Sequence, residues 1–136
     1  MTQEEKQLLL KDLCARLRYG VKFTLSDNIY TMKGIDLIVT DEGDWEYAVT
    51  AKGIEPIEIE YIKPYLRSMS SMTEGERNEY FDFRNQELQR VAFAEVGRES
   101  AIAEISDWLN EHYFDYRGLI EKGLALEAPE GMYKTE

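Results

Sequence analysis

Cysteine, histidine and proline are scarce in this sequence, which has one cysteine, one histidine and three prolines among 136 residues. A lone thiol makes no intramolecular disulfide and is typical of a reducing cytoplasm. Zinc sites need clustered cysteine and histidine ligands, so a zinc centre is excluded. No apolar run approaches the roughly 18 residues of a membrane span, and the N-terminus lacks the basic-then-apolar order of a signal peptide. We expect a soluble cytoplasmic protein without a cofactor.

Phosphate-binding loops and nucleophile motifs are also absent from the sequence. It contains neither a Gly-x-Gly-x-x-Gly nor a Walker loop, and Ser70 and Ser71 do not lie in a Gly-x-Ser-x-Gly elbow. Cys14 falls on the apolar stripe of the first predicted helix, where a buried thiol is inert. The acidic stretch 41–46 lacks the spacing of an EF-hand and is explained by a solvated hairpin tip. These observations predict neither a catalytic residue nor a metal ligand.

His112 is the one candidate for a general base, because it is the only imidazole and has Glu111 beside it. A histidine near a helix end also gains from the helix dipole, which is a structural explanation. No residue near it has the pattern of an activated nucleophile. The structural role is favoured, and a small enzyme that uses His112 remains an alternative.

Positive charge is in short supply: 27 acidic residues against 16 basic ones give a net charge of −11. Residues 1–72 contribute −3 and residues 73–136 contribute −8. Such a field repels phosphate and disfavours direct binding to nucleic acid. Spaced carboxylates on rigid helices suggest a second hypothesis, an acidic DNA mimic that inhibits a nucleic-acid-binding protein. Its residues would be Glu74, Glu76, Glu79, Asp82, Glu87, Glu95, Glu99, Glu104, Asp107 and Glu111.

The first half of the chain predicts one helix followed by a small sheet. Thr2 and Glu5 have capping-box spacing, and the apolar residues Leu9, Leu10, Leu13, Cys14 and Leu17 fall three and four apart. From Val21 to about Ile62 the apolar period changes to two, with turns at 27–28, 41–44 and 52–53. Three or four antiparallel strands are expected, as a meander or a small, partly closed barrel. Pro64 is expected to close this region, since proline donates no ladder hydrogen bond.

The second half predicts helices. Thr73 and Glu76 again have capping-box spacing, so a helix is expected to begin at Glu74, with Tyr80, Phe83, Leu88 and Val91 along its inner side. The spacing leaves open whether residues 74–96 form one helix or two. A further helix should bury one stripe, and a short one should run from Tyr116 to Lys122. The stripe comprises Ile102, Ile105, Trp108, Leu109 and Tyr113.

The expected fold class is therefore α+β: an N-terminal helix, a small antiparallel sheet, then two to three C-terminal helices. Length and composition predict a single domain over residues 1–128, with residues 129–136 as a loosely held tail. Sequence does not reveal the strand order or the oligomeric state.

Aromatic residues around the sheet are the best candidates for a binding surface. On a small sheet they form a peptide groove or a stacking platform, although core packing and cross-strand pairing are the commoner uses. A connector from Tyr65 to Met72 adds one basic side chain to this group. The candidate binding residues are Trp45, Tyr47, Tyr61, Tyr65 and Arg67. They predict a protein-interaction module with another protein as its partner.

Two stretches of the chain carry a family resemblance. The first is Lys63–Arg67 leading to Met69–Glu74, and the second is Asp107–His112 followed by Phe114–Ala125. Together with the opening helix they resemble a family of short, uncharacterised acidic proteins of gut bacteria and their phages or mobile elements. The resemblance covers most of the chain except roughly residues 84–105. It implies a small cytoplasmic accessory protein encoded by a phage or an integrated element, and it brings no catalytic residue with it.

Overall fold

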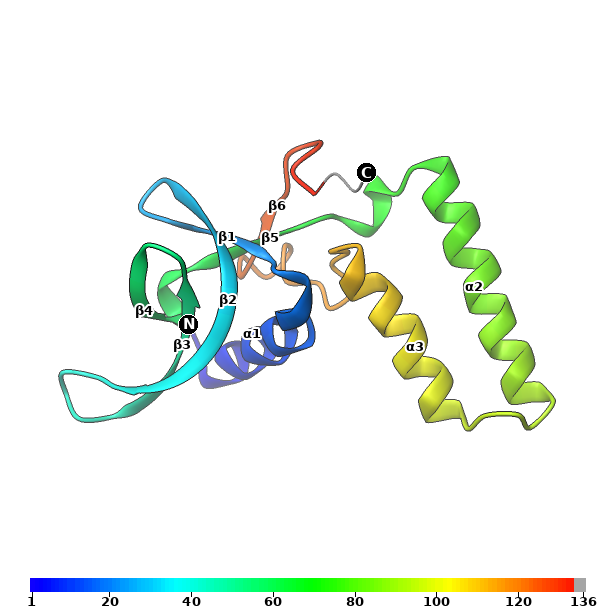
Figure 1. The fold of residues 1–136 in the computed structure, drawn as a ribbon, viewed down its shortest axis with the longest axis horizontal. Coiled ribbons are helices and arrows are strands. Elements are labelled where there is room, and N and C mark those ends of the chain that lie inside the picture. The colour runs from blue at the N-terminus through cyan, green and yellow to red at the C-terminus, as the bar shows by residue number, and fades with distance from the viewer. Residues whose placement is uncertain (134–136) are drawn as a thin grey trace.

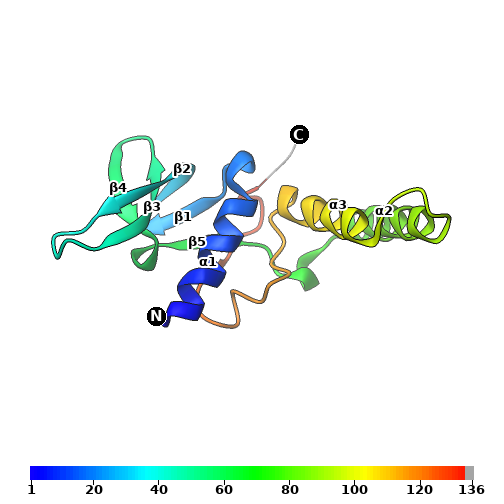
Figure 2. The ribbon, with the colours of Figure 1, turned by 90° about the horizontal axis from the view of Figure 1, so that it is seen from below.

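The structure, a computed structural model, describes residues 1–133 and has an elongated shape with three parts (Figures 1 and 2). A helix and a sheet form the body, a two-stranded ribbon extends from one end, and a helical hairpin extends from the other. The helices are α1 (Gln3–Ala15), α2 (Glu74–Ala92) and α3 (Arg98–Glu111), with 3₁₀ turns η1 (Leu17–Tyr19), η2 (Ile59–Tyr61) and η3 (Met69–Ser71). The strands are β1 (Lys22–Leu25), β2 (Asn28–Val39), β3 (Trp45–Ala51), β4 (Ile54–Glu58), β5 (Lys63–Leu66) and β6 (Leu126–Glu127).

The α+β class and the early elements are confirmed. Thr2 and Thr73 both cap their helices through complete capping boxes, with Glu5 and Glu76 as the reciprocal partners. The pairing of β2 with β3 has a register shift between Met32 and Gly34. A Cβ at Gly34 would lie only 2.8 Å from Oγ1 of Thr50, so a larger residue would push the two strands apart there.

The sheet differs from the prediction in size and in closure. It has six strands in the order β4-β3-β2-β1-β5-β6, antiparallel except for the β5–β6 pair. Within residues 1–133 no pairing joins β4 to β6, so the sheet is open and the barrel-like alternative was wrong. The count of three or four strands was too low because β5 and β6 are short and irregular in sequence.

The prediction that Pro64 closes the sheet region was wrong. Pro64 lies within β5, opposite Phe23 of β1. The β1–β5 pairing covers only Lys63 and Pro64, while Tyr65 and Leu66 pair with β6. A strand with so few ladder contacts on each side loses little from a missing N–H, and this explains why proline is tolerated.

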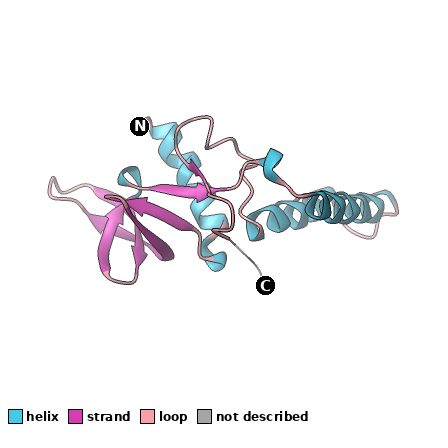
Figure 3. Ribbon diagram, turned by 90° about the horizontal axis from the view of Figure 1, so that it is seen from above, coloured by secondary structure: helices cyan, strands magenta, loops and turns pink. Residues whose placement is uncertain are grey.

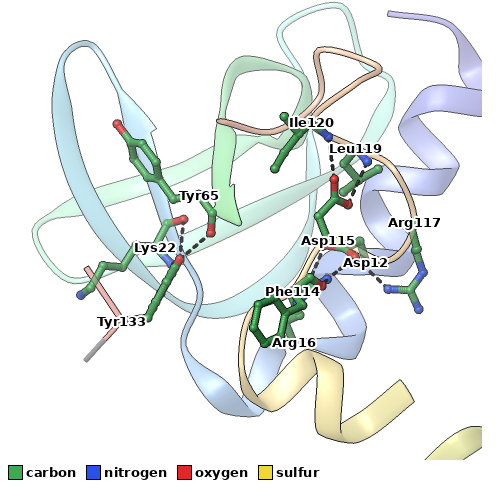
Figure 4. A network of polar contacts seen from close by, with 10 residues as sticks. All are labelled: Asp12, Arg16, Lys22, Tyr65, Phe114, Asp115, Arg117, Leu119, Ile120 and Tyr133. Atoms are coloured by element: carbon green, nitrogen blue, oxygen red, sulfur yellow. Dashed lines mark hydrogen bonds and ion pairs between the residues drawn. The ribbon is translucent and has the colours of Figure 1, made fainter. Parts of the chain in front are cut away.

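One face of α1 closes the main core of the body. Leu9 and Leu13 are fully buried and pack in one cluster with β1, with β5 and with residues 119–125. This part of the chain overlaps the helix predicted for residues 116–122. The prediction was wrong, because the chain makes turns there. Asp115 accepts hydrogen bonds from the backbone N–H groups of Leu119 and Ile120 at 2.9 Å each, so the segment is held by a side chain instead of a helical ladder (Figure 4).

A charged pair is buried beside that core. Asp12 and Arg16 have no exposed surface, and Arg16 also donates from Nη2 to the carbonyl oxygen of Phe114 at 2.7 Å. Arg117 adds a second cation, 2.7 Å from Oδ1 of Asp12 (Figure 4). The buried face of α1 is made by Leu9, Asp12, Leu13 and Arg16, whereas Cys14 lies two residues from both Asp12 and Arg16, on the opposite side of the helix, and is exposed. The assignment of Cys14 to the core was therefore wrong.

The C-terminal segment is fastened to the sheet at Tyr133, within the stretch predicted as a tail. The Tyr133 hydroxyl donates to the carbonyl oxygen of Tyr65 at 2.7 Å and accepts from the N–H of Lys22 at 2.8 Å (Figure 4). Its ring stacks on Tyr113 with centroids 3.7 Å apart. Residues 134–136 of the predicted tail lie outside the described part of the chain.

Helices α2 and α3 form an antiparallel hairpin that extends away from the body (Figure 3). Residues 74–92 form one helix, and a small cluster of Met72, Trp108, Leu109 and Phe114 holds the base of the hairpin. Leu88 and Ile102 were expected to face inward, but they are 47% and 55% exposed. We refer to this unit as the helical arm. No helix among residues 1–133 is long and apolar enough to cross a membrane.

Candidate functional site

The β2–β3 ribbon carries an exposed ladder of large apolar side chains. Leu37 lies opposite Tyr47, and Val39 lies opposite Trp45. Directly opposed residues, and residues two apart on one strand, point to the same face of a sheet. The four side chains therefore share one face, and each is between 45% and 66% exposed. We call this face the ribbon surface, defined by Leu37, Val39, Trp45 and Tyr47.

The ribbon surface continues an apolar row that is buried further along the sheet. Ile35 and Val49 are the next opposed pair on the same face, and they belong to the main core. The row leaves the core as the ribbon extends beyond the end of β4, whose last partner on β3 is Ala48. Contiguous apolar surface exposed in this way marks an interaction site more often than it serves the fold.

The outer edge of β3 is also uncovered along the ribbon. β4 ends at Glu58, so residues 45–47 have no strand on that side within the described part of the chain. The N–H of Thr40 donates to the carbonyl oxygen of Asp44, and strand alternation then turns the backbone groups of Trp45 and Tyr47 away from β2. Those groups can pair with an added strand.

Carboxylates surround this end of the molecule, and we call Glu42, Glu46, Glu58 and Glu60 the acidic rim. Partial desolvation and then the neighbouring Glu60, Glu46 and Glu42 raise the pKa of Glu58. Glu60 and Glu58 raise the pKa of Tyr61, with a smaller effect from Glu42. These pKa shifts are those expected of carboxylates close enough to repel one another. Excess negative charge therefore remains at this end.

Lys6 of α1 forms ion pairs with two carboxylates of the acidic rim. Nζ of Lys6 lies 3.2 Å from Oε1 of Glu46 and 3.5 Å from Oε2 of Glu60. The hydrogen bond to Glu46 raises the pKa of Lys6. A groove of about 290 Å³ runs between α1 and the ribbon, and its lining includes Gln3, Gln7, Leu10, Glu46, Tyr47 and Ile59.

The five predicted binding residues separate into two groups. Trp45, Tyr47 and Tyr61 are exposed at the ribbon end, where Tyr61 is 62% exposed beside the acidic rim. Tyr65 and Arg67 lie elsewhere and hold the fold together: Tyr65 pairs with β6, and Arg67 binds both carboxylate oxygens of Glu76 at 2.6 and 2.7 Å. Leu37 and Val39 were not singled out, because a run of β-branched and aliphatic residues predicts a buried strand.

His112 lines a cleft of about 580 Å³ with Arg67, Glu76, Glu111 and Tyr113. Its ring stacks on Trp108 with centroids 3.9 Å apart, and Nδ1 lies 2.8 Å from the carbonyl oxygen of Trp108. Within residues 1–133 no serine, threonine or cysteine is hydrogen-bonded to it, and no group of three potential metal ligands is present.

Several of the carboxylates named in the DNA-mimic hypothesis already form ion pairs within the protein. Glu76 pairs with Arg67, Glu87 is buried and pairs with Arg90, and Asp107 pairs with Arg18. The remaining acidic residues of the DNA-mimic hypothesis lie on α2 and α3 or in the loop between them.

These features define an α+β protein whose clearest candidate binding surface is an exposed apolar ribbon with an acidic rim. Comparison with known proteins gives no match, neither to a family model, nor to a curated protein, nor to a solved structure.

Proposed function

We propose that this protein is a non-enzymatic interaction module whose ribbon surface docks an apolar, basic segment of another protein. The observation that carries the proposal is the exposed ladder of Leu37 with Tyr47 and Val39 with Trp45. Covering each half-exposed side chain contributes roughly 1 kcal/mol, so the ladder alone contributes about 4 kcal/mol, which corresponds to a dissociation constant of about 1 mM before charge and main-chain contacts are added. In line with the family resemblance, we further propose a cytoplasmic accessory role for a phage or mobile element.

The acidic rim sets the charge of the partner. Desolvation and then mutual repulsion raise the pKa of Glu58, and a lysine or arginine placed beside Glu42, Glu58 and Glu60 would relieve that repulsion. The uncovered edge of β3 favours an extended segment, which adds main-chain hydrogen bonds to the apolar contact.

Trp45 supplies a direct reporter of docking. The chain has two tryptophans, and a Trp108→Phe background leaves the exposed Trp45 as the only one. The probe is a short synthetic peptide that alternates lysine and valine. We expect its titration to shift the Trp45 emission to shorter wavelength, with a dissociation constant of roughly 100 µM or tighter.

Two controls make this experiment decisive. Leu37→Ser with Tyr47→Ser should weaken binding about tenfold or more, whereas Ile29→Ser, equally exposed on β2 but outside the ribbon, should leave it unchanged. A peptide alternating glutamate and valine should not bind. An unshifted Trp45 spectrum, or equal binding of the acidic peptide, would remove the proposal.

The two alternatives from the sequence have less support. His112 is engaged by Trp108 through stacking and a hydrogen bond, and no nucleophile is bonded to it in the described residues. DNA mimicry would need an unbroken acidic track, but Arg77, Arg84, Arg90 and Arg98 interrupt it on the same two helices. The exposed ribbon is the stronger observation.

A further inference from the structure

The helical arm has a second exposed apolar face. On α2 the inward residues are Glu76, Tyr80, Phe83 and Glu87, all half-buried or buried. The residue after each of them lies about 100° further round the helix. These four residues are Arg77, Phe81, Arg84 and Leu88, and all are exposed.

Helix α3 adds to the same face. Ile102 follows the buried Ala101, and Arg98 lies one turn before Ile102. Because α2 and α3 run antiparallel, the same rotational step from the inward line turns both helices toward one side of the hairpin. We call this side the arm face, and it comprises Arg77, Phe81, Arg84, Leu88, Arg98 and Ile102.

The arm face is basic in a strongly acidic protein. Arg16, Arg18, Arg67, Arg90 and Arg117 all form ion pairs with carboxylates. In contrast, Arg77, Arg84 and Arg98 form none within the described chain, and all three belong to this face. Glu74 and Glu99 lie at its margins, and the opposite side carries Glu79, Glu104 and Glu111.

The arm face and the ribbon surface are therefore complementary. Both are apolar at the centre, one is edged by unpaired arginines, and the other is edged by the acidic rim. The two surfaces lie at opposite ends of the long axis (Figures 1 and 2), so one copy cannot bring its own surfaces together.

We propose that the ribbon surface of one copy docks on the arm face of a second copy, so that the protein associates head to tail. This inference rests on the proposed function and names one partner for that surface. Pairing of two arm faces would bring arginines against arginines, so charge favours the unlike contact. In a head-to-tail dimer one ribbon surface and one arm face stay free, so assembly continues beyond the dimer.

Sedimentation velocity over a concentration series tests the inference. The arm variant is Phe81→Ser with Arg84→Glu, and the ribbon variant is Trp45→Ser with Tyr47→Ser. All four residues are exposed, so both variants should keep the far-UV circular dichroism and cooperative unfolding of the wild type. Wild-type protein should grow past the dimer with concentration, and each variant alone should stay monomeric.

Mixing the two variants gives the critical result. Each variant retains one working surface, so an equimolar mixture should form dimers and stop there. The control variant, Ile29→Ser with Lys33→Glu, likewise replaces an exposed apolar residue by serine and a basic residue by glutamate, on β2 outside the ribbon surface, and should assemble like the wild type. Wild-type protein that stays monomeric or stops at a dimer, or a mixture that stays monomeric, would overturn the head-to-tail contact. If the lysine–valine peptide still shifts Trp45 in that case, the proposed function stands and only the self-association fails.

Discussion

At the scale of single residues, Asp12 is the charged group on which the body depends most. It is fully buried and receives hydrogen bonds from Arg16 and Arg117, which come from segments about 100 positions apart in the sequence. Breaking a buried pair by removing one partner leaves an uncompensated charge in a medium of low polarity.

We therefore expect Asp12→Asn to lower the free energy of unfolding by about 3–5 kcal/mol, measured by urea denaturation. The neighbouring Lys11 is exposed, and Lys11→Ala should change stability by less than about 0.5 kcal/mol. A loss below about 1 kcal/mol for Asp12→Asn would mean that water reaches the pair.

A second residue predicts how stability depends on pH. The hydrogen bonds from Arg67 lower the pKa of Glu76 to about 2, and the backbone bond to Thr73 helps. A carboxyl group with a lowered folded-state pKa stabilises the protein above its unfolded value near 4.5 and stops doing so as the pH falls toward 2. Glu76→Gln should remove roughly 2–3 kcal/mol at neutral pH and flatten the loss of stability between about pH 5 and pH 2. Glu74→Gln, at an exposed neighbouring position, is the matched control in pH-dependent denaturation, and an unchanged profile for Glu76→Gln would contradict the assignment.

These two residues show what sequence patterns reveal and what they miss. The capping box of Thr73 with Glu76 is local, so its spacing predicted it. The burial of Asp12 was invisible, because its partners Arg117 and Phe114 are distant in sequence and an acidic residue on a helix normally faces water. Cys14 was misplaced for the same reason.

At the scale of elements, the helical arm should be the least stable part of the fold. Of its longer helix, α2, only Glu87 is buried, and the arm reaches the body through the small cluster at its base. Few buried apolar contacts permit local opening without global unfolding.

Hydrogen exchange measured by mass spectrometry should show this difference directly. We expect the amides of residues 80–92 to exchange through openings that cost less free energy than the openings of β1, β5 and the buried face of α1. Equal protection of the arm and the body would mean that the whole chain opens in one step. Self-association through the arm face should raise the protection of α2, so the comparison is made at low protein concentration.

Element prediction succeeded where one periodicity dominated. The apolar stripe of α1 and the alternation of β1 to β3 are long enough to specify their type. Element prediction failed for β5, β6 and the segment after Asp115, because β5 depends on pairing with β1, β6 depends on pairing with β5, and the segment packs against the core that α1 closes. The candidate site was recovered in part: Trp45, Tyr47 and Tyr61 lie together at the ribbon end, but only the strand register brought Leu37 and Val39 to the same face.

At the scale of the whole molecule, charge is organised along the long axis. The net charge is −11, but it is distributed unevenly. The arm face, at one end, has three arginines without an ion pair among the described residues, and the ribbon, at the other end, is rich in carboxylates. Segregated charge of this kind acts on partner orientation and on the rate of encounter more than on the fold. The two proposed contacts both follow from that polarity.

The long-range fastening of the body has a consequence for synthesis in the cell. Helix α1 emerges early, yet residues that bind and cover it, from Phe114 to Ala125, are translated about 100 residues later. At a translation rate of about 5–20 residues per second, the apolar face of α1 stays uncovered by these residues for roughly 5–20 s. During that interval Leu9 and Leu13 are open to chaperones on the ribosome, and contacts of such high sequence separation should make the final closure slow compared with helix formation.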